Sequence, residues 1–199
     1  MSTNIKLMKN MMSNYSFNIV CTTIGRESLP RLIDSFKNQL NQNDFFTIIS
    51  DTNHKFVQNV LSNYNVNFKL NHIINDGDRL GKFGHPLLNK HINNLDGDFI
   101  MFADDDDYYV DDAFEYIRDV VIEKKLYIFK HKWGDTINWI TKEVTLGNIG
   151  KCMGVIPNTK NLPMFQEDVF GDGLFYENLT KIMEYEFVDK IIYKIRDTI

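Results

Sequence analysis

The amino-acid sequence predicts one α/β domain organised around a mostly parallel β-sheet. Short apolar runs alternate with amphipathic stretches from residue 17 onward, and this alternation is the pattern of repeated strand–helix units. The chain has 199 residues, of which 43% are hydrophobic and 25% are charged, as in ordinary globular proteins. A chain of this length buries about 70% of the surface that its unfolded form exposes, so it needs no disulfide or structural metal to fold.

The first part of the chain contains two strand–helix units and a third strand. Residues 17–24 form an apolar run, and Gly25 and Arg26 then make a turn. Pro30 suits the first turn of the helix that follows, in which apolar residues recur at helical spacing. The elements expected here are a strand at 17–24, a helix at 29–40, a strand at 45–50, a helix around 56–61 and a strand at 68–74.

The second part begins with residues 75–85, which are rich in glycine, aspartate and cations. The clearest strand of the chain lies at 99–103, where five nonpolar residues end at four aspartates. Asp111 and Asp112 are expected to cap the next helix, because acids are favoured at helix N-termini. The remaining expected elements are helices at 87–95, 111–121 and 172–183 and strands at 126–131, 143–156 and 186–195.

Charge and cysteine content exclude several classes of function. The net charge is −5 and the chain has no dense run of Lys or Arg, so we expect no nucleic-acid or anionic-membrane partner. Cys21 and Cys152 have no partner at metal-site or redox spacing. Residues 1–16 lack the apolar stretch of a signal peptide or membrane span. We therefore expect a flexible leader at 1–16, a domain at 17–199 and a soluble cytoplasmic protein, in the host cytoplasm if the source is a virus.

Four consecutive aspartates, Asp104 to Asp107, follow the strand at 99–103. Their carboxylates repel one another by up to about 1 kcal/mol per pair at 4 Å even in water, so a bound cation would stabilise the cluster. The carboxyl end of a strand is also where open α/β sheets bind their ligands. A solvated acidic turn in front of the next helix is the alternative interpretation.

Two familiar acidic motifs do not fit this cluster. Asp104, Asp106 and Glu115 have the spacing of an EF-hand loop, but Tyr109 stands where that loop needs glycine, and a strand precedes the motif in place of a helix. A phosphatase of the haloacid-dehalogenase type places its nucleophilic Asp after the first strand. Here the first strand ends without an acid.

The order of motifs resembles that of GT-A glycosyltransferases, specifically the family 2-like branch, over residues 17–196. FNIVCTTIGRESLPRLIDSFKNQ resembles that family's opening strand, nucleotide-contacting loop and first helix, IISDTNH its second strand, and GDFIMFADDDDYY its strand with the Asp-x-Asp metal motif. The resemblance implies a GT-A three-layer sandwich and a small catalytic domain similar to viral or bacterial members. It also implies a nucleotide-sugar half at 17–107 and an acceptor half at 108–199.

The same resemblance implies a donor site. The segment 81–93 occupies the place of the family's Gly-rich stretch and Arg–Asn helix, but the family's Arg is absent. Lys82 and His85 could replace that Arg and Asn89 could take the Asn role, or the segment could be a solvated loop. The residues expected to contact the donor are Thr22, Thr23, Arg26, Asp51, Lys82, His85, Asn89, Asp104 and Asp105, with Asp104 and Asp106 as the metal ligands.

On the acceptor side, the acidic motif of inverting members resembles residues 165–179, and Asp172 would be the catalytic base. Glu167 and Asp168 are acceptor-loop or capping candidates. The ending at 184–198 resembles the family's closing strand with its Tyr-x-x-Arg, here Tyr193 and Arg196. Some relatives continue into a metal-binding His that this chain lacks.

These residues together suggest a metal-dependent glycosyltransferase. An Asp-bound Mn²⁺ or Mg²⁺ would stabilise the leaving diphosphate of a nucleotide sugar, with a UDP-sugar favoured. A hydroxyl of a carbohydrate or glycoprotein would be the acceptor, and the reaction would invert the anomeric centre. The alternatives are a sugar-phosphate nucleotidyltransferase, which TTIGRESLP disfavours because it has one Arg and few glycines, and a non-catalytic binding module.

Three further side chains carry open interpretations. Trp133 and Trp139 flank Gly134 in a polar segment, where they line the acceptor cleft or act as ordinary core or rim aromatics. His131 is equally compatible with a hydrogen-bonded structural histidine.

Overall fold

The parallel half of the sheet is formed by the first four long strands of the chain. The computed structural model describes residues 14–138 and 141–196. β1 (Phe17–Thr23) lies between β2 (Phe45–Ser50) and β4 (Phe99–Asp104), with β3 (Lys69–Ile74) at the edge, and all three pairings are parallel. All seven residues of β1 are buried, as expected of a parallel strand covered on both faces.

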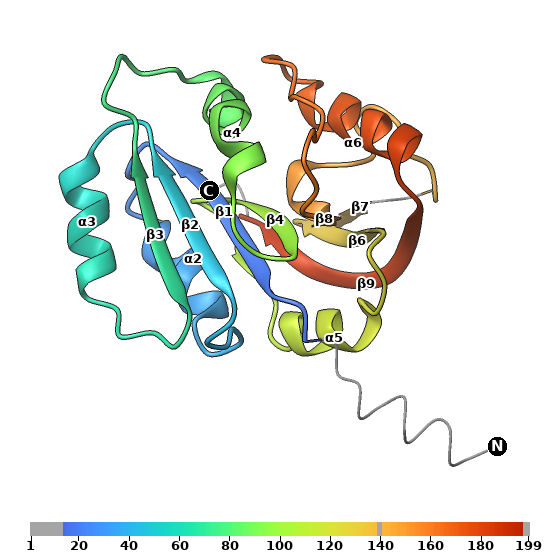
Figure 1. The fold of residues 1–199 in the computed structure, drawn as a ribbon, viewed down its shortest axis with the longest axis horizontal. Helices are drawn as coiled ribbons and strands as arrows, with labels where there is room; N and C mark the ends of the chain where they lie inside the picture. The colour runs from blue at the N-terminus through green and yellow to red at the C-terminus, as the bar shows by residue number, and fades with distance from the viewer. Residues whose placement is uncertain (1–13, 139–140, 197–199) are drawn as a thin grey trace, which may run out of the picture.

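The register of these strands brings their carboxyl ends to one edge. Thr22 pairs with Asp104, and Thr23 pairs with Ser50. In Figure 1 the arrowheads of β1, β2 and β3 point to the upper edge, and α4 (His85–His91) and α6 (Gly171–Ile182) both lie above the sheet. Loops that follow different strands therefore meet at this edge.

The helices of the first half follow the apolar spacing of the sequence. α2 (Leu29–Phe36) carries Pro30 in its first turn and buries a stripe of apolar residues against the sheet: Leu29, Leu32, Ile33 and Phe36. This helix ends at Phe36, earlier than the predicted position 40. α3 (His54–Ser62) contains the predicted 56–61 segment, while the predicted helix at 87–95 divides into α4 and the 3₁₀ turn η2 (Ile92–Asn94).

The second half continues the sheet with mixed pairing. β8 (Gly154–Pro157) joins β4 and β6 (Leu126–Trp133) by antiparallel pairing, and β6 pairs in parallel with the long β9 (Tyr185–Ile195). The short strands β5 (Tyr108–Tyr109) and β7 (Thr136–Asn138) attach to β9 and β6. α5 (Ala113–Val120) and α6 complete a mixed α/β fold, which confirms the predicted class.

The predicted strand at 143–156 is wrong over most of its length. Residues 143–150 have no regular structure apart from a turn at 146–148, the 3₁₀ turn η3 (Lys151–Met153) follows, and the strand begins only at Gly154. Gly147 adopts φ +78°, a left-handed conformation that interrupts a strand. Asp112 occupies the N-cap of α5 as predicted, although its side chain makes no capping hydrogen bond.

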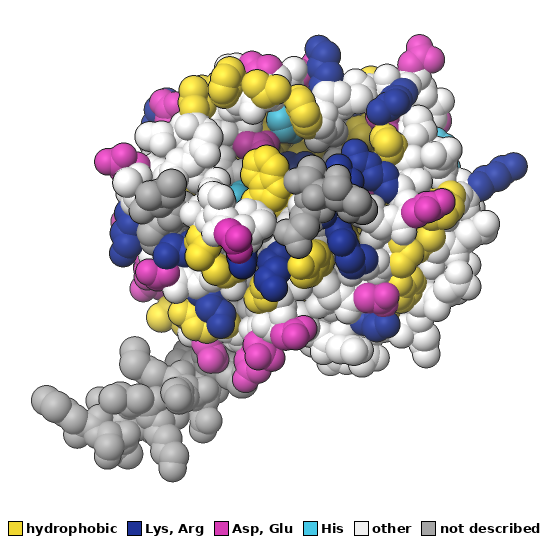
Figure 2. All heavy atoms as spheres, turned by 180° about the vertical axis from the view of Figure 1, so that it is seen from behind, with side chains coloured by type: hydrophobic (Ala, Val, Ile, Leu, Met, Phe, Trp, Pro, Cys, Tyr) yellow, Lys and Arg dark blue, Asp and Glu magenta, His cyan; other side chains and the backbone are white. Residues whose placement is uncertain are grey.

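Residues 1–13 of the expected leader and Trp139 lie outside the described residues. At the end of the expected leader, the backbone N–H and the hydroxyl of Ser16 donate hydrogen bonds to Asp98. Within the described ranges, no helix is long and apolar enough to cross a membrane. Figure 2 shows Lys and Arg side chains interspersed with Asp and Glu over the rear face, with hydrophobic side chains exposed among them.

Candidate active site

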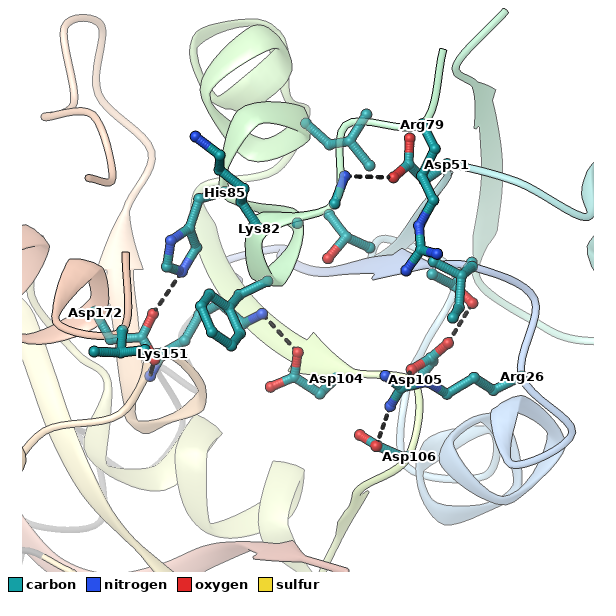
Figure 3. A pocket seen from close by; sticks show the side chains of 18 of the residues that line it. Arg26, Asp51, Arg79, Lys82, His85, Asp104, Asp105, Asp106, Lys151 and Asp172 are labelled. Carbon is teal, nitrogen blue, oxygen red and sulfur yellow. Dashed lines mark hydrogen bonds and ion pairs between the residues drawn. The ribbon is translucent and has the colours of Figure 1, made fainter. Parts of the chain in front are cut away.

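A cavity of about 510 Å³ opens at the carboxyl edge of the parallel strands. Loops after β1, β2 and β4 line it, together with the 79–85 segment, η3 and the first turn of α6 (Figure 3). The sequence-predicted residues that line it are Thr22, Thr23, Arg26, Asp51, Lys82, His85, Asp104, Asp105, Asp106 and Asp172. The fold thus gathers residues that are up to about 150 positions apart in the chain.

Asp104, Asp105 and Asp106 are held by basic and hydroxyl side chains. Asp104 Oδ1 lies 2.6 Å from the ammonium nitrogen of Lys151. Asp106 forms ion pairs with Arg26 and with Arg196, whose Nη1 is 3.1 Å from Oδ2. The hydroxyl of Thr23 donates to Asp105 and accepts a hydrogen bond from the backbone N–H of Gly25, so this loop fixes the cluster in place.

The interpretation of this cluster as a solvated turn is wrong, because Asp105, Asp106 and Asp107 are buried. Burial raises the pKa of Asp105, although Thr23 and Arg26 oppose the shift. Burial and then the charges of its acidic neighbours raise the pKa of Asp107 to about 7, against a hydrogen bond from a backbone N–H. Ionisation of these carboxyl groups beside the cavity is therefore unfavourable.

The end of β9 supports the cluster, at the two positions that the sequence resemblance singled out. The hydroxyl of Tyr193 accepts a hydrogen bond from the backbone N–H of Asp104 over 2.9 Å. The backbone N–H of Arg196 donates to Asp107 over 3.0 Å, and its guanidinium pairs with Asp106. Both residues therefore hold the acids from the end of β9.

Lys151 and Arg79 are cavity-lining cations that sequence reasoning missed, and Lys151 is the buried one. Its side chain is only 4% exposed, and although burial lowers its pKa, the charges of Asp104 and Asp172 raise it overall. Its backbone N–H donates to Asp172 over 3.0 Å, and its carbonyl accepts from the hydroxyl of Tyr176 over 2.8 Å. A single Lys inside the glycine-bounded run GKCMG was the available signal, since a lysine among apolar residues needs a charged partner when buried.

Asp172 stands in the first turn of α6, and one third of its side chain is exposed. Its Oδ1 is 3.0 Å from Nε2 of His85, and its Oδ2 accepts the Lys151 backbone N–H. Burial raises the pKa of Asp172, but the hydrogen bond from His85 and the charge of Lys151 outweigh burial and hold the pKa below its usual value. Asp172 is therefore a charged carboxylate that faces the cavity.

The acids just before Asp172 have separate partners. Glu167 pairs with the exposed Lys82, with Nζ and Oε2 3.1 Å apart. Asp168 lines the cavity and accepts the backbone N–H of Phe170 over 2.8 Å.

Asp51 organises the loop that forms the opposite wall. Its buried carboxylate accepts the backbone N–H groups of Leu80 and Gly81 and the side-chain amide of Asn75, all at 2.9–3.1 Å. Burial raises the pKa of Asp51, but these N–H donors outweigh it and lower the pKa below its usual value. The hydrogen bonds of the Asp51 carboxylate thus hold the conformation of residues 75–81.

Residues 81–84 all have positive φ, at 63°, 45°, 58° and 77°. Gly84 packs against β1 so closely that a Cβ would lie 2.7 Å from the Cβ of Thr22, which makes glycine necessary. The left-handed Lys82 and Phe83 are strained, and such strain concentrates at ligand sites. Phe83 is 61% exposed and lines the cavity.

Asn89 is absent from the cavity lining. Its side-chain amide donates to the carbonyl of Phe165 and accepts the Phe165 backbone N–H, at 2.9 and 2.8 Å. These bonds use Asn89 to anchor the 165 segment, so we leave it out of the donor site proposed below.

Trp133 is exposed at the end of β6 and is also absent from the cavity lining. His131 matches the structural interpretation, since it is buried with Nδ1 3.3 Å from the sulfur of Cys152. Burial lowers the pKa of His131 to about 4, despite the opposing charge of Asp172.

Comparison with known proteins places this site in a family. The crystal structure of residues 1–349 of S. aureus TarS has a TM-score of 0.72 and 17% identity, covering 90% of this chain and 60% of that one. The same TarS fragment in complex with UDP-GlcNAc gives 0.69 and 18%, covering 92% and 60%. The mannosyltransferase PcManGT from Pyrobaculum calidifontis, in complex with GDP-Man and Mn²⁺, gives 0.64 and 10%, covering 90% and 56%.

These likenesses establish the fold, and the chain spans less than two thirds of the length of these structures. No curated protein matches the sequence. Residues 18–161, however, match glycosyl transferase family 2. Since the match covers most of the chain, this protein belongs to glycosyl transferase family 2.

Proposed function

We propose that this protein transfers a sugar from a nucleoside-diphosphate sugar, with a UDP-sugar favoured, to a hydroxyl group of a carbohydrate or glycoprotein acceptor. One observation carries the proposal: a single cavity contains both the paired acids at 104–106 and the separate carboxylate of Asp172. In Figure 3, Asp172 and Lys151 lie on one side of the cavity, Asp51 and Arg79 lie on the other, and Asp104 lies between them. Sugar transfer requires these two functions in one site, at the leaving diphosphate and at the attacking hydroxyl.

The donor would bind along the wall built from the β1 loop and the 79–85 segment. Thr22, Thr23 and Asp51 border the space for the nucleoside, and the cations Arg26, Arg79 and Lys82 border the space for the diphosphate. The bound UDP-GlcNAc of TarS and GDP-Man of PcManGT, which share this fold, support a nucleotide sugar as the donor.

A divalent cation fits the acids on chemical grounds. Among the described residues, no group of three potential ligands is arranged to hold a metal without help. Mg²⁺ and similar ions, however, are commonly bound by one or two carboxylates together with substrate phosphates. Asp104, 39% exposed on the cavity, and Asp106 would hold Mn²⁺ or Mg²⁺ in this way. When bound, the ion would act as a Lewis acid toward the leaving diphosphate.

Asp172 would act as the general base. Its carboxylate is charged and faces the cavity, so it can take the proton of an acceptor hydroxyl while that oxygen attacks the anomeric carbon. The bond from the anomeric carbon to the diphosphate breaks in the same displacement, which inverts the anomeric centre. Such proton transfer contributes about 10²- to 10⁴-fold to a rate.

Isothermal titration tests the donor site. UDP, UDP-sugars and GDP-sugars are titrated with Mn²⁺ or Mg²⁺ and again with a chelator, into the wild-type protein and into Asp104→Ala/Asp106→Ala. We expect metal-dependent binding that the double variant loses. If no nucleotide binds under any of these conditions, the proposal is wrong.

Asp172→Asn separates an enzyme from a binding module. We expect it to bind donor and metal like the wild type but to transfer sugar at least 10²-fold more slowly, because the base is absent. Donor hydrolysis and transfer to glycan acceptors are both measured by assaying the nucleoside diphosphate that they release. A variant that retained most of the turnover would remove Asp172 from the mechanism.

A further inference from the structure

His85 lies between two hydrogen-bond acceptors. Its ring is 3% exposed, with Nε2 3.0 Å from Oδ1 of Asp172 and Nδ1 2.7 Å from the carbonyl oxygen of Gln166. Figure 3 shows the ring pointing from α4 toward Asp172. The ring stacks on Phe165, with centroids 5.0 Å apart and an interplanar angle of 14°, and Phe165 stacks in turn on Phe175. Both ring nitrogens are therefore held against oxygen atoms.

The number of protons on this contact follows from its partners. A carbonyl oxygen can only accept, so Nδ1 carries a proton. A neutral imidazole has only one N–H, and Nε2 would then direct a lone pair at a carboxylate oxygen 3.0 Å away. A hydrogen bond at Nε2 requires one more proton, shared between Nε2 and Oδ1.

We infer that His85 and Asp172 form a pair that holds one exchangeable proton, so that His85 is a positioning residue for the base and not a ligand of the nucleotide. This inference rests on the proposed function of Asp172. It reassigns a residue that the sequence resemblance placed in the donor site.

The chain around the His85 ring is packed so closely that position 171 has no space for a side chain. A Cβ on Gly171 would lie 2.7 Å from Cε1 of His85, so a residue with a side chain would push the ring away from Asp172. The segment that accepts the Nδ1 proton is itself anchored, because Phe165 exchanges two hydrogen bonds with Asn89. α4, the segment at 165–166 and α6 thus together fix the orientation of the His85 ring.

The pair changes the basicity of Asp172. Without the shared proton, the lone pair of Nε2 and the carboxylate repel each other, and uptake of a proton relieves this repulsion. During transfer the acceptor O–H bond breaks, its electrons form the new bond to the anomeric carbon, and the bond from that carbon to the diphosphate breaks. The released proton goes to the carboxylate of Asp172 while His85 keeps the shared proton, and solvent then removes the transferred proton. The histidine thereby holds Oδ1 of a base whose other oxygen accepts the Lys151 backbone N–H, and it lowers the pKa of Asp172 so that the carboxylate stays charged.

Other ionisable groups also act on Asp172. Lys151 of η3 favours the carboxylate form of Asp172. The remaining groups coupled to Asp172 are His131, Cys152 and Tyr176. The other ionisable residues that line the same cavity are Arg26, Asp51, Arg79, Lys82, Asp104, Asp105, Asp106 and Asp168.

Nitrogen-15 NMR of the histidine rings tests the pair without any need for activity. Wild-type protein and Asp172→Asn are compared at pH 7. The ring signals of His85 are assigned by correlation with its backbone signals, and His54, hydrogen-bonded to Ser50, serves as the internal reference. We expect both His85 nitrogens to be protonated or proton-sharing in the wild type, and a neutral ring with its proton on Nδ1 in the variant. Identical His85 spectra in the two proteins would overturn the inference.

Kinetics of His85→Gln then test the role. The amide can still donate to Asp172 but cannot hold a second proton. We expect kcat to fall at least tenfold, as part of the 10²- to 10⁴-fold contribution of the base, and the Kd for UDP to change less than twofold. The acid limb of the kcat profile should move to higher pH, because the charge of His85 that lowers the pKa of Asp172 is gone. A tenfold weaker UDP affinity with an unchanged acid limb would return His85 to the donor site. If the wild type transfers no sugar, the proposed function fails while the NMR result still stands.

Discussion

Lys151→Met should increase the affinity of the site for a divalent cation. The ammonium of Lys151 and a metal ion would both need the carboxylate of Asp104, so the two compete. Met has a similar length and no charge, and it preserves the backbone N–H that Lys151 donates to Asp172.

The size of the effect follows from the geometry. Two charges 2.6 Å apart attract by about 6 kcal/mol at an effective dielectric constant of 20. Desolvation of the buried ammonium cancels most of this attraction, and Asp104 is 39% exposed, so solvent screens the remainder. A net competition of about 1–2 kcal/mol corresponds to about 5- to 30-fold in Kd.

Calorimetric titration of Mn²⁺ into protein saturated with UDP measures this change. Lys181→Met is the matched control, because Lys181 is an exposed lysine whose partner, Glu177, lies on the same helix. The control should bind Mn²⁺ like the wild type. An unchanged or weaker Mn²⁺ affinity in Lys151→Met would refute the idea that the ammonium and the metal share Asp104.

Two further predictions concern the cavity loop and the pH dependence of stability. Gly84→Ala should weaken UDP binding at least tenfold, because the new Cβ meets Thr22 and the left-handed backbone disfavours alanine by a further 1–2 kcal/mol or so. The control is Gly134→Ala, which has φ +54° and open space around the new Cβ, so it should carry only the backbone penalty and leave UDP binding measured by calorimetry unchanged. Equal effects of the two variants would contradict this explanation. The pKa of His131 is about 4 in the folded protein and about 6.5 in the unfolded chain, so the unfolded state binds more protons as the pH falls through this window, and about 3 kcal/mol of stability is lost between pH 6.5 and 4. Urea denaturation at pH 7 and pH 4.5 should show a smaller loss in His131→Gln than in the wild type, and an equal loss would mean that His131 is not buried in its neutral form.

Much of the fold could be predicted because burial leaves a direct record in the sequence. The apolar runs at β1, β2 and β4 are strands covered on both faces, and the stripe of α2 repeats at helical spacing. The segment at 143–150 misled the prediction, since its apolar residues follow no period: Ile149 is buried, Val144 is half-buried and Leu146 is exposed. β5 and β7, of two and three residues, are too short to leave a pattern.

The candidate site could be predicted only in part. Asp104 and Asp106 were predicted from their position at a strand end together with the family resemblance, and Asp172 from the resemblance of residues 165–179 to the family's acidic motif. The fold brings all three to one cavity. The partners of a polar side chain are not encoded locally. Asn89 and Asp51 have residue types that suit a ligand equally well, yet their hydrogen bonds hold backbone segments. Lys151 had no motif, because its partner lies 47 positions away.

The attachment of the acidic cluster to β9 has a consequence for folding. Tyr193 and Arg196 contact acids about 90 positions earlier in the chain, and β9 reaches them through its long parallel pairing with β6. Contacts between distant parts of a chain form late, because closing a long loop costs entropy before the contact repays it. The strands that carry the acids can therefore assemble before the acids acquire their counter-charges. Binding competence should be among the last properties that the folding protein gains, and a bound ligand should slow the first step of its unfolding.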